Sequence, residues 1–134
     1  MTDTQIPEEL RYTKEHEWIR KTGSLTVRVG VTDYAQQALN DVVFVQLPEV
    51  DSEVEENESF AEVESHKSVS DIYGPLNGTV SAVNDALEAS PELVNSDPYG
   101  DGWLCEITVA DDVDLDAVLG DLLDAAGYRA VISD

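Results

Sequence analysis

Lys67 is the residue whose type and setting most favour a chemical role in this chain. It is the last of only three lysines in the sequence. The small polar residues Ser65 and Ser68 stand beside it in a segment expected to bend, so its amine should project from the surface. An amine on a flexible stem at a rigid hairpin tip suits covalent attachment of an acyl cofactor, because the stem then tethers the attached group at high local concentration. A solvated surface lysine is the commoner case, but this chain otherwise avoids lysine.

A second pattern imitates a calcium site. Asp112, Asp114 and Asp116 alternate as in the opening of a calcium-binding loop. The pattern fails further along, because Ala117 stands where the loop needs glycine for its turn and Leu123 where it needs a bidentate glutamate. We therefore interpret these aspartates as the solvated N-terminus of a helix.

The histidines and the cysteine do not form a catalytic pattern. His16-Glu17 is not followed by a second histidine one helical turn later, as a zinc protease motif requires. Cys105 falls on a core-facing position of an expected strand with no base beside it, which favours a buried structural thiol. A lone cysteine excludes an internal disulfide and suits a reducing compartment. With two histidines and one cysteine, we expect no metal site and no catalysis at zinc or haem.

Charge is the dominant feature of the composition. The 134 residues, which we expect to form one domain over 1–134, carry 29 Asp and Glu against 7 Lys and Arg, for a net charge of −22. Without a cluster of basic residues the chain should bind neither nucleic acid nor an anionic membrane. The carboxylates are dispersed, and salt would screen their mutual repulsion. The composition therefore resembles that of a cytoplasmic protein from a halophile.

Targeting signals are not evident in the sequence. Residues 1–9 are acidic and lack the apolar stretch of a secretory signal or the arginines of a transit peptide. No apolar run approaches the ~20 residues that span a bilayer. We expect a soluble, cytoplasmic protein.

Hydrophobic alternation predicts a mostly β domain made of short strands. In the second of its two hairpins, Phe60, Glu62 and Glu64 should share one face, and Ala61 and Val63 the other. The expected strands are 17–20, 25–31, 42–47, 59–64, 69–73, 79–83 and 103–109.

Helices are expected only at the margins of the strands. Thr32 or Asp33 should cap a short helix over 34–39. The stretch 86–102 reads as a loop with one short helical turn. An apolar stripe at three- and four-residue spacings predicts a C-terminal helix over 115–126, which Gly120 should divide into two pieces.

The sequence around Lys67 resembles the lipoyl-attachment site of the glycine cleavage system H proteins. The similarity lies in Glu64-Ser65-His66-Lys67-Ser68-Val69-Ser70-Asp71 and continues through most of the chain, from about residue 12 to 128. The further matching segments are His16-Glu17-Trp18, residues 30–36, residues 41–48 and residues 95–104.

This resemblance implies a barrel-sandwich hybrid, the β sandwich of lipoyl and biotinyl carriers, with short flanking and C-terminal helices. It implies lipoate on Lys67, added by a lipoyl-attaching enzyme. The lipoylated Lys67 side chain, or arm, would take the aminomethyl group left when the P protein decarboxylates glycine. It would then pass this group to the folate-dependent T protein. The L protein, a dihydrolipoyl dehydrogenase, would then reoxidise it. The chain would be a carrier and not an enzyme.

The resemblance also bears on residues around the arm. Glu17 and Asp71 match family positions near the cleft that receives the loaded arm, and a carboxylate there would favour a cationic adduct. The alternative is that both are ordinary surface acids. His66 replaces a residue that is usually small and apolar, and Tyr34 stands where some members have histidine.

Other carriers and other classes of protein remain open. A lipoyl domain of a 2-oxoacid dehydrogenase would be shorter and would lack the region around 99–103 and the C-terminal helices. A biotinyl domain usually has methionines beside its lysine, whereas His66 and Ser68 stand here. The chain could instead be a non-carrier interaction protein whose acidic surface binds a basic partner, or a donor of lipoyl groups to other carriers.

Overall fold

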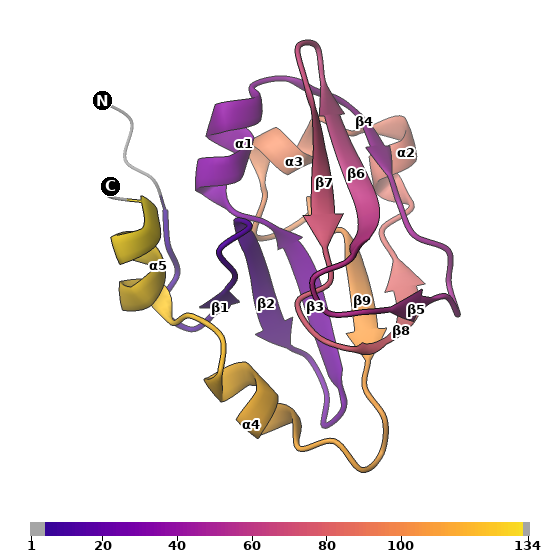
Figure 1. Cartoon of the computed structure of the whole chain (residues 1–134). Coiled ribbons are helices and arrows are strands. Elements are labelled where there is room, and N and C mark those ends of the chain that lie inside the picture. Colours follow the sequence, from indigo (N-terminus) through magenta and orange to yellow (C-terminus); the bar gives the residue numbers. More distant parts are fainter. Residues whose placement is uncertain (1–4, 133–134) are drawn as a thin grey trace.

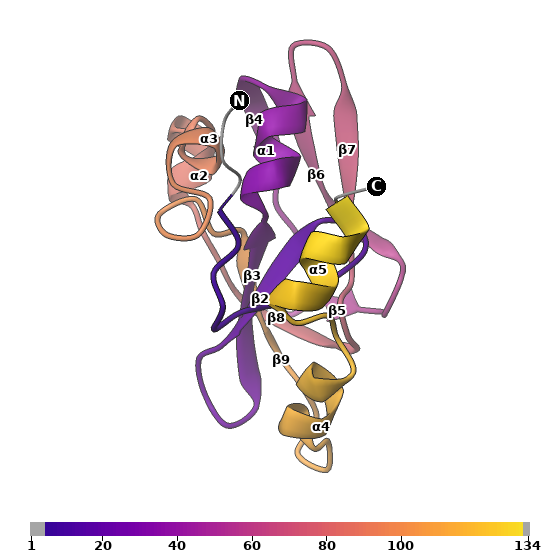
Figure 2. The ribbon, with the colours of Figure 1, turned by 90° about the vertical axis from the view of Figure 1, so that its left-hand side faces the viewer.

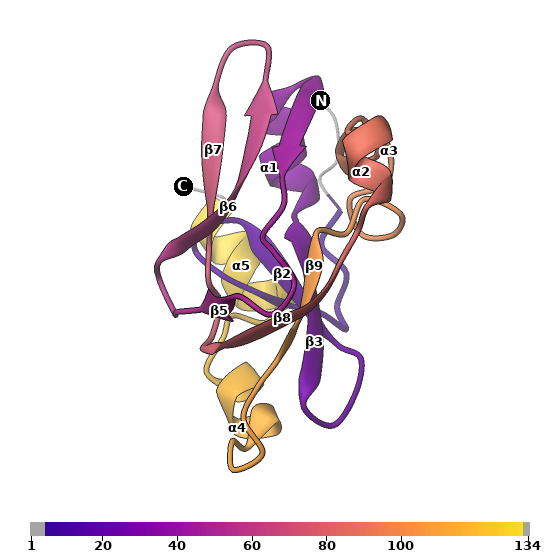
Figure 3. The same ribbon diagram turned by 90° about the vertical axis from the view of Figure 1, so that its right-hand side faces the viewer.

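Strands dominate the architecture and form two sheets, of six and three strands, with short helices around them (Figure 1). The computed structural model describes residues 5–132. Residues 133–134 lie outside this part, as do residues 1–4 of the acidic N-terminal stretch discussed above. In two views related to Figure 1 by 90° turns, one hairpin of the small sheet stands out at one end of the molecule (Figures 2 and 3). The helix α4 (Leu115–Gly120) lies at the other end.

The large sheet is antiparallel throughout its paired strands. Val27 and Val29 of its third strand lie opposite Ile107 and Cys105, and all four side chains are buried. The alternation therefore predicted the core face correctly. The strand order is β1 (Arg11–Tyr12), β2 (Glu17–Lys21), β3 (Thr26–Val31), β9 (Cys105–Thr108), β8 (Gly78–Val83) and β5 (Glu53–Val54).

The small sheet has the order β4 (Val42–Gln46), β6 (Ser59–Ser65) and β7 (Val69–Tyr73). Ala61 and Val63 are buried as predicted. Phe60 departs from the expected alternation, because the register shifts between Ser59 and Ala61 and the Phe60 ring packs against core residues. A bulge of this kind redirects one side chain without ending the pairing.

The helices are short and follow local capping signals. Thr32 caps α1 (Asp33–Leu39), and its side chain accepts a hydrogen bond from the Ala35 backbone N–H at 3.2 Å. Residues 86–102 contain two helical turns where we expected one, α2 (Ala86–Ala89) and α3 (Leu93–Ser96). None of the helices among residues 5–132 has the length and apolar character needed to cross a membrane.

The C-terminal segment divides into two helices, as predicted from Gly120. The helix α4 ends at that residue, and α5 (Ala125–Ile132) follows after a four-residue connection. Asp114 caps α4 by accepting a hydrogen bond from the Ala117 N–H, which confirms that this aspartate marks a helix N-terminus. The second helix extends beyond the expected end at residue 126, because Tyr128 is buried against Tyr12 with the rings stacked at 4.8 Å.

Candidate functional site

Lys67 lies in the three-residue connection between β6 and β7, and its side chain is exposed, as predicted. The turn is the projecting end of the hairpin at the top of Figure 1. Among residues 5–132, no hydrogen bond or ion pair involves the Lys67 ammonium. Its nitrogen is therefore available to an enzyme that approaches the tip.

The hairpin under Lys67 is held by the core on one face. Val63 and Ile72 are buried there, and β4 extends the sheet by pairing with β6. A strand pair anchored in this way by a third strand and an apolar face is stable in a way that an isolated hairpin is not. The structure thus combines a firmly held hairpin with a free amine at its tip.

The opposite face of the small sheet, beside the tip, is exposed and partly apolar. Phe44 lies opposite Glu64 in β6, and Glu64 lies opposite Val69 in β7, so these three side chains form a row across the sheet. Phe44 is 52% exposed and Val69 is 54% exposed. The next row consists of Gln46, Glu62 and Asp71. We refer to these six residues as the outer face of the small sheet.

Glu17 occupies a buried position at the start of β2. It is 1% exposed, and its carboxylate accepts hydrogen bonds from the Tyr73 backbone N–H at 2.7 Å and from the Thr13 hydroxyl at 3.2 Å. Burial raises the pKa of Glu17 to about 8, although these two hydrogen bonds lower it in part. Within residues 5–132 no cation forms an ion pair with it. Burial thus favours the protonated form of Glu17 more than it would be favoured in an exposed glutamate.

A pocket of about 230 Å³ opens beside Glu17. It lies where the base of the hairpin meets the N-terminal and C-terminal segments. Its rim carries one lysine, Lys14, and several carboxylates. The residues that line it are Tyr12, Thr13, Lys14, Glu15, Glu17, Glu56, Asn57, Tyr73, Gly74, Pro75, Asp121, Leu122 and Leu123.

The two predicted cleft residues are not in contact. Asp71 does not line the pocket beside Glu17. It is exposed on the outer face of the small sheet, where its carboxylate accepts a weak hydrogen bond from the Ser59 hydroxyl at 3.4 Å. The alternative that both residues are ordinary surface acids is therefore wrong for Glu17, which is buried. It agrees with the exposure of Asp71.

Tyr128 forms a cluster with His16 and Thr32 that no motif in the sequence indicates. The Tyr128 hydroxyl lies 2.9 Å from His16 Nδ1 and 2.7 Å from the Thr32 hydroxyl. The His16 ring also lies 4.8 Å from the ring of Tyr34, measured between centroids. A histidine is thus present beside position 34, supplied by another segment. Burial lowers the pKa of His16, so its neutral form is favoured. Only contacts between distant segments create this cluster, and no local pattern signals it.

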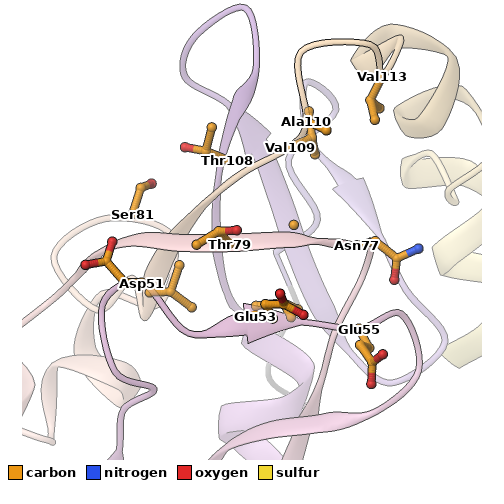
Figure 4. A pocket seen from close by; sticks show the side chains of 13 residues that line it. Asp51, Glu53, Glu55, Asn77, Thr79, Ser81, Thr108, Val109, Ala110 and Val113 are labelled. Atoms are coloured by element: carbon orange, nitrogen blue, oxygen red, sulfur yellow. The ribbon is translucent and has the colours of Figure 1, made fainter.

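A larger groove, of about 740 Å³, is lined by residues of β5 and β8 (Figure 4). These two strands lie away from the hairpin tip that carries Lys67 (Figure 1). Figure 4 shows hydroxyls of Thr79, Ser81 and Thr108 along it and carboxylates at its edge. Its lining contains no lysine, histidine or cysteine. Cys105 itself is fully buried, and burial raises its thiol pKa to about 12, which confirms a structural thiol. Neither feature offers an exposed amine or a reactive thiol.

Two sheets joined by Phe60, which packs against the core clusters beneath both of them, and an exposed lysine at a hairpin tip define the lipoyl-carrier type of β sandwich. A crystal structure of a glycine cleavage system H protein from Mycobacterium marinum has a similar fold, with a TM-score of 0.82. Its sequence is 42% identical, and the match covers 93% of this chain and 97% of that one.

Sequence comparison agrees with the fold. The glycine cleavage H-protein family profile matches residues 10–134. The glycine cleavage system H protein of Mycolicibacterium gilvum is 61% identical over 131 residues, covering 98% of this chain and 99% of the relative. That of Mycobacterium avium is 58% identical over the same length, with the same coverage. The chain belongs to the glycine cleavage H-protein family.

Proposed function

We propose that this chain is the lipoyl-bearing carrier of the glycine cleavage system, with lipoate in amide linkage to Lys67. The observation that carries the proposal is the free, exposed amine of Lys67 at a firmly held hairpin tip, in a chain of the H-protein family. The residues present fit the cofactor, because amide formation needs an accessible amine and nothing among residues 5–132 occupies it. Bound lipoate supplies the sulfur atoms that accept the transferred group.

The proposed cycle requires three enzymes and no catalysis by the chain itself. The P protein decarboxylates glycine and loads the aminomethyl group, the T protein passes it to folate, and the L protein reoxidises the arm. Residues 1–134 would act as one carrier domain. Each of the three enzymes, and the lipoyl-attaching enzyme, would bind this domain in turn. The chain's own task is to hold Lys67 outward at the tip of the small sheet.

The outer face of the small sheet is the surface we assign to these partners. It lies beside the tip, so an enzyme that takes the arm meets it first. The exposed Phe44 and Val69 offer apolar area, and Glu62, Glu64 and Asp71 surround it with negative charge. Such a surface fits a partner face with an apolar centre and basic residues at its rim.

The pocket beside Glu17 is the place we assign to the loaded end of the arm. An aminomethyl adduct is cationic near neutral pH, and Glu17 is a buried acid with no counter-ion among the described residues. Arrival of the cation would favour the ionised carboxylate, with release of its proton, and give a charge-assisted hydrogen bond. Asp71 lies on the same strand as Tyr73, which lines this pocket, and would attract the cation from outside.

The surface charge suggests the setting in which the carrier works. A net charge of −22 on 134 residues repels itself at ordinary ionic strength. We therefore propose adaptation to a cytoplasm rich in salt. The free, buried thiol of Cys105 fits a reducing compartment of this kind.

Loading with glycine tests the proposal directly. Lipoylated wild-type protein, incubated with glycine and the pyridoxal-phosphate P protein, should gain the mass of glycine less carbon dioxide. The Lys67→Arg variant should keep its fold, because the tip is exposed, and should not be loaded, because a guanidinium cannot form the lipoyl amide. Loading of Lys67→Arg to the same extent as wild type would contradict the proposed function.

A further inference from the structure

A backbone hydrogen bond from the Ser65 N–H to the Ser68 carbonyl closes the loop that holds Lys67, so His66 and Lys67 are the two residues inside it. This loop lacks the residues that usually close a hairpin of this length. Two-residue loops favour turn types with positive φ, at glycine, asparagine or aspartate, because these match the twist of the strands. His66 and Lys67 are not glycine, asparagine or aspartate, and neither of the two residues has a positive φ. The turn therefore needs a further contact to hold its two ends together.

Ser65 supplies that contact from beneath the turn. Its hydroxyl accepts a hydrogen bond from the Ser68 backbone N–H at 3.3 Å and lies 3.3 Å from the Ser68 carbonyl, to which it can donate. The Ser65 backbone N–H also donates to that carbonyl, at 2.8 Å. Ser65 is 4% exposed, whereas His66, Lys67 and Ser68 are all exposed. One buried hydroxyl thus bridges both backbone groups of Ser68.

We propose that Ser65 is a positioning residue for the acylation of Lys67: its bridge to Ser68 sets the turn in the shape that the lipoyl-attaching enzyme recognises. The inference rests on the proposed function of Lys67. In the reaction, Lys67 Nζ bonds to the carbonyl carbon of an activated lipoyl donor, a mixed anhydride with phosphate. The carbon–oxygen bond of the anhydride breaks, the phosphate leaves with the electron pair, and the nitrogen loses a proton to solvent.

A rate effect follows from the geometry of this step. The enzyme must bring Nζ to the donor carbonyl, and a misplacement of about 1 Å can cost up to ~100-fold in rate. Without the Ser65 hydroxyl, the Ser68 N–H loses its side-chain partner and the turn gains freedom. Lys67 would remain chemically available but would be presented in many orientations.

The test compares Ser65→Ala, Ser65→Thr and Ser68→Ala with the wild-type chain. Each unmodified protein is treated with the purified lipoyl-attaching enzyme and its activated donor, and kcat/KM at Lys67 is followed by peptide mapping. Ser68→Ala is the matched control, because it removes a hydroxyl from the same turn, together with that hydroxyl's 3.4 Å contact with the Ser65 hydroxyl, and keeps both contacts of the Ser65 hydroxyl with the Ser68 backbone. A parallel reaction with acetic anhydride measures the accessibility of Lys67 without an enzyme.

We expect Ser65→Ala to lower the enzymatic kcat/KM by about tenfold or more. Ser65→Thr, which keeps the hydroxyl, should recover most of the rate, and Ser68→Ala should resemble wild type. Acetylation of Lys67 by acetic anhydride should proceed at the same rate in all four proteins. If the substitutions acted only by changing the exposure of Lys67, this rate would differ among them.

Several results would overturn the positioning role. These are equal enzymatic rates for Ser65→Ala and wild type, an equal loss in Ser68→Ala, a parallel loss with acetic anhydride, or a Ser65→Ala chain that does not fold. A wild-type chain that the enzyme does not acylate at Lys67 would instead contradict the proposed function. The two failures are therefore distinguishable.

Discussion

The buried carboxylate of Glu17 accepts a hydrogen bond from the backbone N–H of Tyr73 at 2.7 Å. This contact joins the start of β2 in the large sheet to the last residue of β7, the strand that descends from the Lys67 tip. The two sheets are thus linked by an acid whose charge depends on pH, because burial raises its pKa to about 8. The stability of the fold and the binding of a cationic adduct should therefore both depend on pH.

Glu17 should make the protein less stable as the pH rises. The raised pKa means that the folded state holds a proton that the unfolded state loses above its ordinary pKa of about 4.3. This contribution is full below that value and is lost as the pH rises towards about 8, with a slope of up to about 1.4 kcal/mol per pH unit. Glu17→Gln should remove this slope, as measured by urea denaturation between these two pH values.

Repulsion among the surface carboxylates also makes the fold less stable as the pH rises. A control variant with the same change in charge as Glu17→Gln is therefore needed. Glu88 is exposed on α2, and Glu88→Gln removes one carboxylate without touching the buried site. Its pH dependence should stay close to that of wild type. If Glu17→Gln and Glu88→Gln showed the same pH dependence, the buried acid would not be the cause.

The loaded arm should decay faster when its proposed pocket is changed. Release of formaldehyde and ammonia from the loaded carrier, without T protein, should accelerate in Glu17→Gln, and less in the exposed Asp71→Asn, because a docked adduct is shielded from water. Protection in wild type should strengthen as the pH rises from about 6 to about 8, where Glu17 ionises more readily. Equal release rates in all variants would mean that the arm waits in solvent.

Salt should stabilise the fold. Raising potassium chloride from about 0.1 M to about 1 M shortens the Debye length from ~10 Å to ~3 Å and screens the repulsion among dispersed carboxylates. The melting temperature should therefore rise. A variant that combines Glu55→Gln, Glu56→Gln and Glu58→Gln should show a smaller rise in melting temperature. A melting temperature that stays constant up to multimolar salt would contradict adaptation to a salt-rich cytoplasm.

The elements that position Lys67 could be predicted because their signals are local. The alternation of Ala61 and Val63 with polar residues marks β6, and Thr32 marks the start of α1 through its capping hydrogen bond. The strands β1 and β5 were missed because two residues are too few to show a period. Phe60 was placed on the wrong face because a bulge shifts the register and leaves no trace in hydrophobicity.

The surroundings of the site were harder to predict than its central residue. The position of Lys67 follows from one hairpin, whereas the surroundings of Glu17 depend on its contact with Tyr73 of the other sheet. The bridge from Ser65 to Ser68 depends on backbone geometry within the turn. The contact of His16 with Tyr128 joins residues 112 positions apart. None of these relationships is encoded in spacing along the chain.

The central claim is that Lys67 carries lipoate, and the mass of the protein from its native host measures this most directly. The intact chain should be heavier than its sequence by one lipoyl group, and peptide mapping should place the increment on Lys67. Lys14 and Lys21 should be unmodified. A chain at the mass of its bare sequence, a biotinyl increment, or lipoate on either of the other lysines would contradict the account.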